Sequence, residues 1–311
     1  MLELIGGSCR VDTTRRKLRV DQRTDNQVFL SASRRQLYDK AWEYISIAAK
    51  QRMPEHWQEL RLEKLSSVLA ALRHQIDKAK EGELTALLLA LLIVQSPQAA
   101  RAQELMKKRG IRFNDREDRL HELISFNDTF VDLILSFEEI PKDIKDNIYY
   151  EIHRVCGITR THSFSYKDYG AISKGLEREI ALYKAAQSAG FEARMTSRIA
   201  DGLGVDMQIS DKESGVQVNV DCKTESSFRF KLQALSRQGR VDNEEFLKAD
   251  ENGYVYFTVG RGKEAIPVVL LRLDDELTGG VEEFRFRNED SVGAIIQVLI
   301  EKFGTRRKLI L

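Results

Sequence analysis

The chain has almost no net charge. Its 311 residues include 49 Lys and Arg against 48 Asp and Glu, which gives a formal charge of +1 at neutral pH. A protein that coats nucleic acid non-specifically usually carries an overall basic excess, because neutralising each phosphate requires a Lys or Arg side chain. Any contact with nucleic acid must therefore depend on a few local side chains.

Cysteine and histidine are also scarce. The three cysteines, Cys9, Cys156 and Cys222, lie far apart and match no spacing typical of a zinc knuckle or a disulfide framework. None of the five histidines has a partner at metal-ligand spacing. The N-terminus lacks the apolar core of a signal peptide. We expect a reduced, cytoplasmic protein without a histidine metal site and without a membrane partner.

The N-terminal half predicts an arm followed by a helical domain. Residues 1–32 are rich in arginine and poor in apolar side chains, which fits either a solvated extension or a basic arm lying along a phosphate backbone. Residues 33–156 show the apolar periodicity of helices and predict an all-α domain. We expect helices over 34–51, 55–80, 84–94, 97–109, 116–136 and 141–155, with Ser33 as the first N-cap.

The segment 84–94 is an almost unbroken apolar run. A membrane-spanning helix needs about 20 apolar residues, and this run is shorter. It predicts a fully buried helix at the centre of a bundle, with a subunit interface as the alternative.

Residues 157–170 have little apolar periodicity and predict a linker between two domains. The remaining residues, 171–311, alternate between helix and strand patterns, so we expect an α+β protein overall. Its second domain should contain helices over 173–189, 226–238 and 291–303, and strands over 191–199, 216–223, 254–259 and 268–273, with Ser173 capping the first helix.

The stretch from Gly202 to Lys223 carries the strongest chemical signal. A glycine turn precedes Asp206, a polar turn follows at 211–215, and residues 216–223 then alternate strictly between apolar and polar. This predicts a strand with one buried face, on whose other face Asp221 and Lys223 lie about 7 Å apart. Pairing the two strands would bring Asp206 to the same end. Two carboxylates and a lysine at one sheet edge can hold a divalent cation and activate a water, although a solvated surface hairpin explains the same pattern.

The order of these features resembles the PD-(D/E)xK nuclease superfamily, whose members have the restriction-endonuclease-like fold. The resemblance covers roughly residues 170–275. Asp206 matches the aspartate of the first half of the motif, with Val205 in place of the usual proline, and Asp221 and Lys223 match the second half. Glu179, on the helix eleven residues before Gly190, matches the glutamate that many members carry there.

The resemblance implies a mixed central sheet and a metal-dependent nuclease. Mg²⁺, with Mn²⁺ as a possible substitute, would be held by Asp206 and Asp221 together with Glu179, or with Glu177 in its place. Oxygen ligands of this kind suit Mg²⁺, which keeps several of its waters. Lys223 would orient or help to deprotonate a water and offset charge in the transition state, so the expected catalytic residues are Asp206, Asp221, Lys223 and Glu179.

The same resemblance implies a nucleic-acid substrate, with DNA favoured over RNA. The helical domain would supply target choice, dimerisation or control, and a homodimer is compatible with the pattern. Polar and basic side chains near the motif would contact the nucleic acid, namely Gln208, Arg229, Lys231, Gln233 and Arg237. The alternatives are a catalytically inactive nuclease-like domain that binds nucleic acid or supports assembly, and a helical scaffold with a small appended sheet.

Overall fold

A computed structural model describes residues 32–52, 64–80, 82–108, 121–196, 204–260 and 265–306. The basic arm, apart from its last residue, lies outside this range, as do Cys9, His56, Gly202 and the end of the basic tail. Parts of the helices expected over 55–80 and 116–136, and the end of the strand expected over 191–199, fall in the same gaps.

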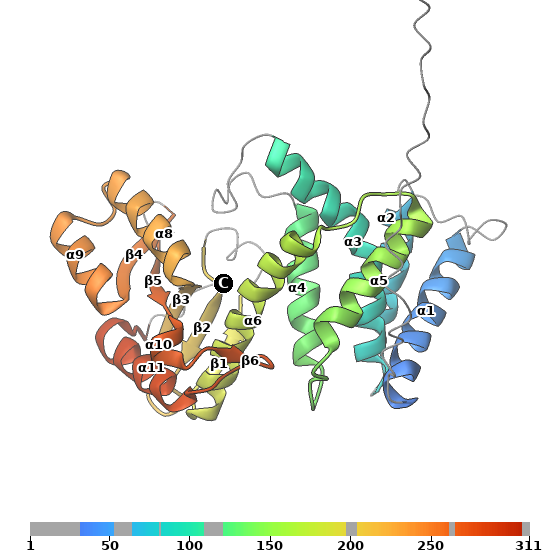
Figure 1. Cartoon of the computed structure of the whole chain (residues 1–311). Helices are drawn as coiled ribbons and strands as arrows, with labels where there is room; N and C mark the ends of the chain where they lie inside the picture. The colour runs from blue at the N-terminus through green and yellow to red at the C-terminus, as the bar shows by residue number, and fades with distance from the viewer. Residues whose placement is uncertain are drawn as a thin grey trace, which may run out of the picture.

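The N-terminal half of the described chain is all α-helical, as predicted. Helix α3 (Leu84–Lys108) lies at the centre of the bundle and packs against the four other helices (Figure 1). Its apolar first half, Ala86–Val94, is buried on all sides. The surrounding helices are α1 (Ala32–Arg52), α2 (Leu65–Ile76), α4 (His121–Leu135) and α5 (Ile144–Thr159).

The prediction of two short helices over 84–94 and 97–109 is wrong, because α3 continues through Pro97. Proline inside a helix leaves the carbonyl four residues earlier without its N–H partner. Here that carbonyl is Ile93 O, and the Ser96 hydroxyl donates to it at 2.7 Å. The side-chain hydrogen bond replaces the missing backbone bond, so the helix does not end at the proline.

Because α3 is a single helix of 25 residues, the argument that the apolar run 84–94 is too short to span a membrane no longer applies. Among the described helices, α3 has the length and the apolar composition that could cross a bilayer, but 78% of its apolar window is buried inside the protein. That burial is what a central core helix shows.

The expected linker is mostly helical. Helix α5 extends to Thr159, and α6 (Tyr166–Ser188) begins seven residues before the predicted Ser173 cap. The actual cap is Ser165, whose hydroxyl accepts from Asp168 N–H at 3.1 Å, whereas Ser173 is buried inside the helix. The polar sequence 163–168 therefore marks a helix start, because serine and aspartate are preferred there as well as in loops.

The C-terminal half contains a mixed five-stranded sheet in the order β1-β2-β3-β5-β4. Neighbours pair antiparallel except β3 and β5, which are parallel. The α+β fold class is thus confirmed. The strands are β1 (Glu192–Met195), β2 (Met207–Ser210), β3 (Gln217–Lys223), β4 (Tyr254–Val259) and β5 (Ile266–Arg272).

Helices cover both faces of this sheet. On one face α6 and α11 (Glu289–Phe303) pack on Val218, Val220 and Cys222 of β3. On the other face α8 (Glu225–Arg237) and α9 (Asn243–Asn252) enclose a second apolar cluster with β4 and β5. The prediction that β3 has one buried face is therefore wrong: Asn219 and Asp221 on its polar side are also buried, because β3 is a central strand.

Helix α6 and a small hairpin join the two halves. Ile172, Leu176 and Ile180 of α6 belong to the core of the helical bundle, and its next turns pack on the sheet. The hairpin of β6 (Val281–Glu282) and β7 (Arg285–Phe286), after the short helix α10 (Asp275–Thr278), was not predicted. Its turn residue Phe284 is buried in the bundle core, 6.2 Å from the ring of Phe130.

We predict that Phe284→Ala lowers the free energy of unfolding by about 3–5 kcal/mol, because a fully buried aromatic anchor is lost. Chemical denaturation measures the change. Glu283→Gly is the matched control: Glu283 holds φ at 50°, which glycine adopts without strain, so we expect a change of less than about 1 kcal/mol. A loss below about 1 kcal/mol for Phe284→Ala would contradict this role.

Candidate functional site

The candidate site lies at the carboxyl end of β3. Asp221 and Lys223 belong to that strand, and Asp206 immediately precedes β2, which pairs with it. Asp206 N–H donates to Val220 O at 2.9 Å, which fixes Asp206 opposite the end of β3. The hairpin register therefore brings together the three residues that the sequence singled out. The turn between the strands is as expected, with Gly215 at φ +66°.

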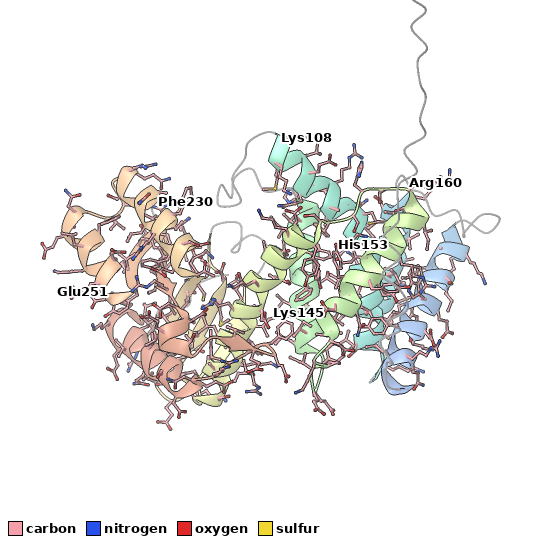
Figure 2. All side chains as sticks on the ribbon, in the orientation of Figure 1. Lys108, Lys145, His153, Arg160, Phe230 and Glu251 are labelled. Carbon is pink, nitrogen blue, oxygen red and sulfur yellow. The ribbon has the colours of Figure 1, made fainter. Side chains whose placement is uncertain are left out.

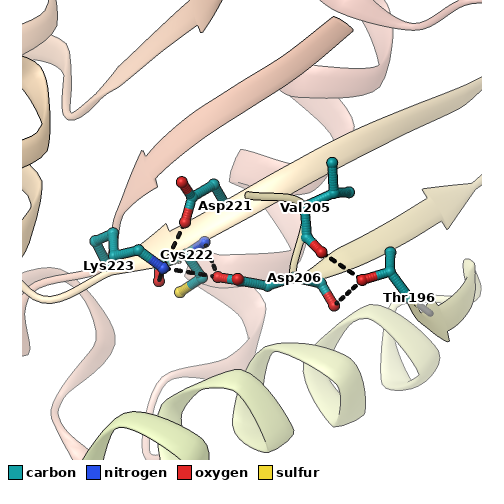
Figure 3. A network of polar contacts seen from close by, with 6 residues as sticks. All are labelled: Thr196, Val205, Asp206, Asp221, Cys222 and Lys223. Carbon is teal, nitrogen blue, oxygen red and sulfur yellow. Dashed lines mark hydrogen bonds and ion pairs between the residues drawn. The ribbon is translucent and has the colours of Figure 1, made fainter. Parts of the chain in front are cut away.

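Three oxygens converge on the Lys223 ammonium (Figure 3). Lys223 Nζ lies 2.9 Å from Asp206 Oδ2 and 2.9 Å from Cys222 O, and it forms an ion pair with Asp221 Oδ1. Cys222 N–H also donates to Asp206 Oδ2 at 2.9 Å. The two carboxylates are thus held in one place by a shared cation and a backbone donor.

The two carboxylates and the ammonium are largely buried, so their charges must be paired with one another. Asp221 is 0% exposed and Asp206 is 7% exposed, while the Lys223 side chain is 17% exposed. Charged groups that leave water must be paired and hydrogen-bonded, because their desolvation is costly. With the ammonium between them, the two carboxylates can lie side by side despite their mutual repulsion.

The end of β3 next to this cluster is bonded to the end of β5 and leads directly into helix α8. Leu273 N–H donates to Lys223 O at 3.3 Å, which ties the end of β5 to the end of β3. Helix α8 begins two residues after Lys223, and its N-cap Thr224 makes no side-chain capping bond. The first turn of a helix carries partial positive charge, which favours an anion near its N–H groups.

Cys222 lies between Asp221 and Lys223 in β3, and its side chain points to the opposite face. Burial raises the pKa of its thiol, and the charged neighbours that act on this pKa are Lys223, Asp206, Arg178 and Glu179. The thiol is therefore protonated at neutral pH and is not a nucleophile. Glu179 of α6 is among the charged groups that act on the Cys222 thiol, on the face of β3 opposite the two aspartates.

The structure does not bring Glu177 to this cluster, which corrects its assignment as a metal ligand in place of Glu179. Its Oε2 lies 2.9 Å from Nζ of Lys145, a residue of helix α5 in the bundle that is labelled in Figure 2. Glu177 and Glu179 are two residues apart in a helix, so their side chains point in nearly opposite directions. The pattern of the sequence did not separate them because both lie near the apolar stripe.

The expected nucleic-acid contacts fall into two groups. Arg229, Gln233 and Arg237 form one exposed stripe along α8, one helical turn apart. Arg229 also pairs within the protein, with Glu225 at 3.2 Å and Asp250 at 3.3 Å. Lys231 is half-buried on the same helix.

Gln208 shares the face of Asp206, as predicted from the strand phase, and lies next to Asn219. Its amide nitrogen is 3.4 Å from Asn219 Oδ1, and Asn219 in turn donates to Pro267 O at 3.0 Å. These contacts connect β2, β3 and β5 on the face of the sheet that carries the two carboxylates.

The oxygen atoms of the site supply part of the ligand set that a hard divalent cation requires. Asp206 Oδ2, Asp221 Oδ1 and Cys222 O are oxygens, and Mg²⁺ in proteins is commonly bound by one or two carboxylates while it keeps several waters. Within the described ranges, however, no group of three or more His, Cys, Asp or Glu side chains is close enough to hold a metal. The larger set with Glu179 and Glu177 is not assembled there; the two aspartates are the residues that fit.

One buried arginine was missed by the sequence analysis. Arg178 donates to Leu273 O, and its Nη2 lies 2.8 Å from Asp275 Oδ1. It ties α6 to the end of β5 beside the site. Nothing in the local sequence distinguishes it from a surface arginine, because its partners are almost 100 residues away.

Comparisons with known proteins leave the family open. No family model matches the chain, and no curated protein or solved structure is significantly similar to it.

We predict that Lys223→Met lowers the free energy of unfolding by about 3–5 kcal/mol in EDTA, because it leaves two buried carboxylates without their cation. Mg²⁺ should restore part of this loss by taking the place of the ammonium. Thermal and urea denaturation with and without Mg²⁺ measure both effects. Lys248→Met is the control: it removes an exposed pair with Glu244 and should cost about 0.3–0.5 kcal/mol. Equal effects of the two substitutions would show that the Lys223 network is not structurally important.

Proposed function

We propose that the protein is a metal-dependent nuclease that hydrolyses phosphodiester bonds, with DNA favoured over RNA as substrate. The observation that carries this proposal is the convergence of Asp206, Asp221 and Lys223 at the carboxyl end of β3. Ligands in open α/β sheets commonly bind at the carboxyl ends of parallel strands, and β3 and β5 are the parallel pair here.

The order of elements supports the same proposal. Helix α6 precedes the meander β1-β2-β3, and α8 leads to β5, which lies parallel to β3. This is the order of helix, three strands, helix and strand on which the resemblance to PD-(D/E)xK nucleases was based. Helix α9 and strand β4 are inserted before β5, and β4 forms the outer edge of the sheet.

The residues of the site have distinct roles in this proposal. Asp206 and Asp221 would hold Mg²⁺ together with the Cys222 carbonyl oxygen. When bound, the ion supplies Lewis-acid stabilisation of the charge on the phosphate and lowers the pKa of a water. Lys223 would turn its ammonium from the carboxylates towards the phosphate and the attacking water, where it offsets the growing negative charge.

The neighbouring helices would position the substrate. The first turn of α8 offers backbone N–H groups to a phosphate oxygen. The stripe of Arg229, Gln233 and Arg237 continues from there along the surface. Glu179 is not grouped with the two aspartates among the described residues, so its expected role as a further ligand rests on the resemblance alone.

We predict that the protein cleaves nucleic acid with Mg²⁺ or Mn²⁺ and not with EDTA. Asp206→Asn, Asp221→Asn and Lys223→Met should each lower the rate at least about 100-fold, because each removes a preorganised charge. A gel assay across plasmid, linear duplex, single-stranded DNA and tRNA tests both the activity and the preference for DNA. Asp250→Asn, which changes a carboxylate on α9 that pairs with Arg229, is the control and should cleave as the parent does.

We also predict that Mg²⁺ stabilises the fold through the two aspartates. At 100 times its Kd, an ion that binds only the folded state adds about 2.7 kcal/mol to the free energy of unfolding. Asp221→Asn should abolish this gain, whereas Glu177→Gln should keep it, because Glu177 pairs with Lys145 away from the site. Differential scanning calorimetry with and without Mg²⁺ checks this. An undiminished gain in Asp221→Asn would place the ion elsewhere.

The inactive nuclease-like module remains the second candidate, because the Lys223 ammonium already pairs with both aspartates and offsets one of their two charges, and the described residues offer no third acidic ligand. Nucleic-acid binding without cleavage, and without stabilisation by Mg²⁺, would favour it.

A further inference from the structure

A cleft lies beside α6, and one of its lining residues is Arg178, which ties α6 to the end of β5 near the candidate nuclease site. It has a volume of about 550 Å³ and is bounded by the first turn of α5, by α6, and by the segment from Asp275 to Arg287. This volume falls within the range of about 300–1,000 Å³ that is typical of ligand sites. The cleft is separate from the Asp206–Lys223 cluster, none of whose residues lines it.

One stripe of α6 forms its longest wall. Tyr166, Gly170, Lys174 and Glu177 recur at the spacing of one helical turn, and the stripe ends at Arg178 beside the nuclease site. From Tyr166 to Arg178 the helix rises about 18 Å. A strand of nucleic acid that passes the site could therefore reach the far end of the cleft along a single helix.

Tyr166 offers a flat, exposed surface at that end. Its side chain is 69% exposed, and the ring is held edge-on by Tyr149, with 5.5 Å between centroids and an interplanar angle of 80°. A T-shaped contact orients the ring, and the high exposure of Tyr166 leaves most of its surface accessible. Exposed aromatic faces of this kind stack with nucleobases, whichever base is present.

The charges of the cleft suit a phosphate next to that ring. Four cationic and three acidic side chains line it. Two of the acids are already neutralised, Glu177 by Lys145 and Asp275 by Arg178. Lys174 is exposed on the α6 wall, and Arg287 faces it from the other side of the cleft while pairing with Glu282 at 3.0 Å. Asp146 is the remaining acid, so the lining side chains carry a net charge of +1, and a phosphate would compete with Glu282 for Arg287.

We propose that this cleft binds a nucleotide, with its base stacked on Tyr166 and its phosphate near Lys174 and Arg287. The proposal rests on the proposed function in one respect: the nucleotide would belong to a single-stranded part of the nucleic acid that the nuclease site cuts. A free mononucleotide has the same chemistry and is the other possible source.

Binding of a fluorescent single-stranded oligonucleotide to the full chain in EDTA tests the proposal without cleavage. Tyr166→Ala should weaken binding about 5- to 150-fold, which corresponds to the loss of one base stack, whereas Tyr166→Phe should bind as the parent does. Gly170→Leu should also weaken binding, because an added side chain at Gly170 meets open space in the cleft and fills it.

Gly157→Leu is the matched control. It makes the same change at an exposed position of α5 that does not line the cleft and where a Cβ likewise meets open space. Both substitutions replace a helical glycine, so neither should lower helix stability. We expect Gly157→Leu to bind as the parent does.

Competition by AMP shows whether the cleft binds a free mononucleotide or a nucleotide within a nucleic-acid strand. Displacement of the oligonucleotide by AMP, with the same sensitivity to Tyr166→Ala, supports a free nucleotide; no displacement supports a strand. Parental affinity in both Tyr166→Ala and Gly170→Leu would overturn the proposal, even if Mg²⁺-dependent cleavage is found. Conversely, binding that depends on Tyr166 and Gly170 in a protein that never cleaves would support the cleft and reject the nuclease function.

Discussion

Two buried carboxylates that share one ammonium are the constraint on which the C-terminal half depends. Asp206 immediately precedes β2 and Asp221 lies in β3, and Lys223 reaches both only when the β2–β3 register is correct. A register shift by one residue would turn these side chains to the opposite face and leave charges buried without partners. The polar cluster thus specifies the hairpin as well as the candidate chemistry.

Helix α6 connects this cluster to the rest of the protein. Its first half packs in the helical bundle and its second half on the sheet, while Arg178 attaches it to the end of β5. Residues of the same helix line the cleft, and one of them, Arg178, lies next to the candidate site. Phe284, inserted into the bundle core from the C-terminal half, holds the two halves together at a second point. The helical bundle is therefore positioned to influence what reaches the site.

Much of the secondary structure was predictable from local patterns. Strand β4 has the predicted bounds, and β3 differs by one residue, because alternation and β-branched side chains are local signals. Two errors arose where a serine side chain makes a hydrogen bond three residues away and so changes where a helix begins or continues. Pro97 was expected to begin a helix, but Ser96 satisfies the free carbonyl of Ile93 and the helix continues. Residues 163–168 were assigned to a linker, although Ser165 caps α6.

The sequence by itself determined the α+β class, the hairpin and the three residues of the site, because these follow from periodicity and from spacing within 18 residues. Only the tertiary structure decided that β3 is buried on both faces, that Glu177 pairs with Lys145, and that Arg178 reaches Leu273. These features depend on contacts between segments distant in the chain. A short sequence pattern reports the periodicity of one element, and it carries no information about which other element covers each face.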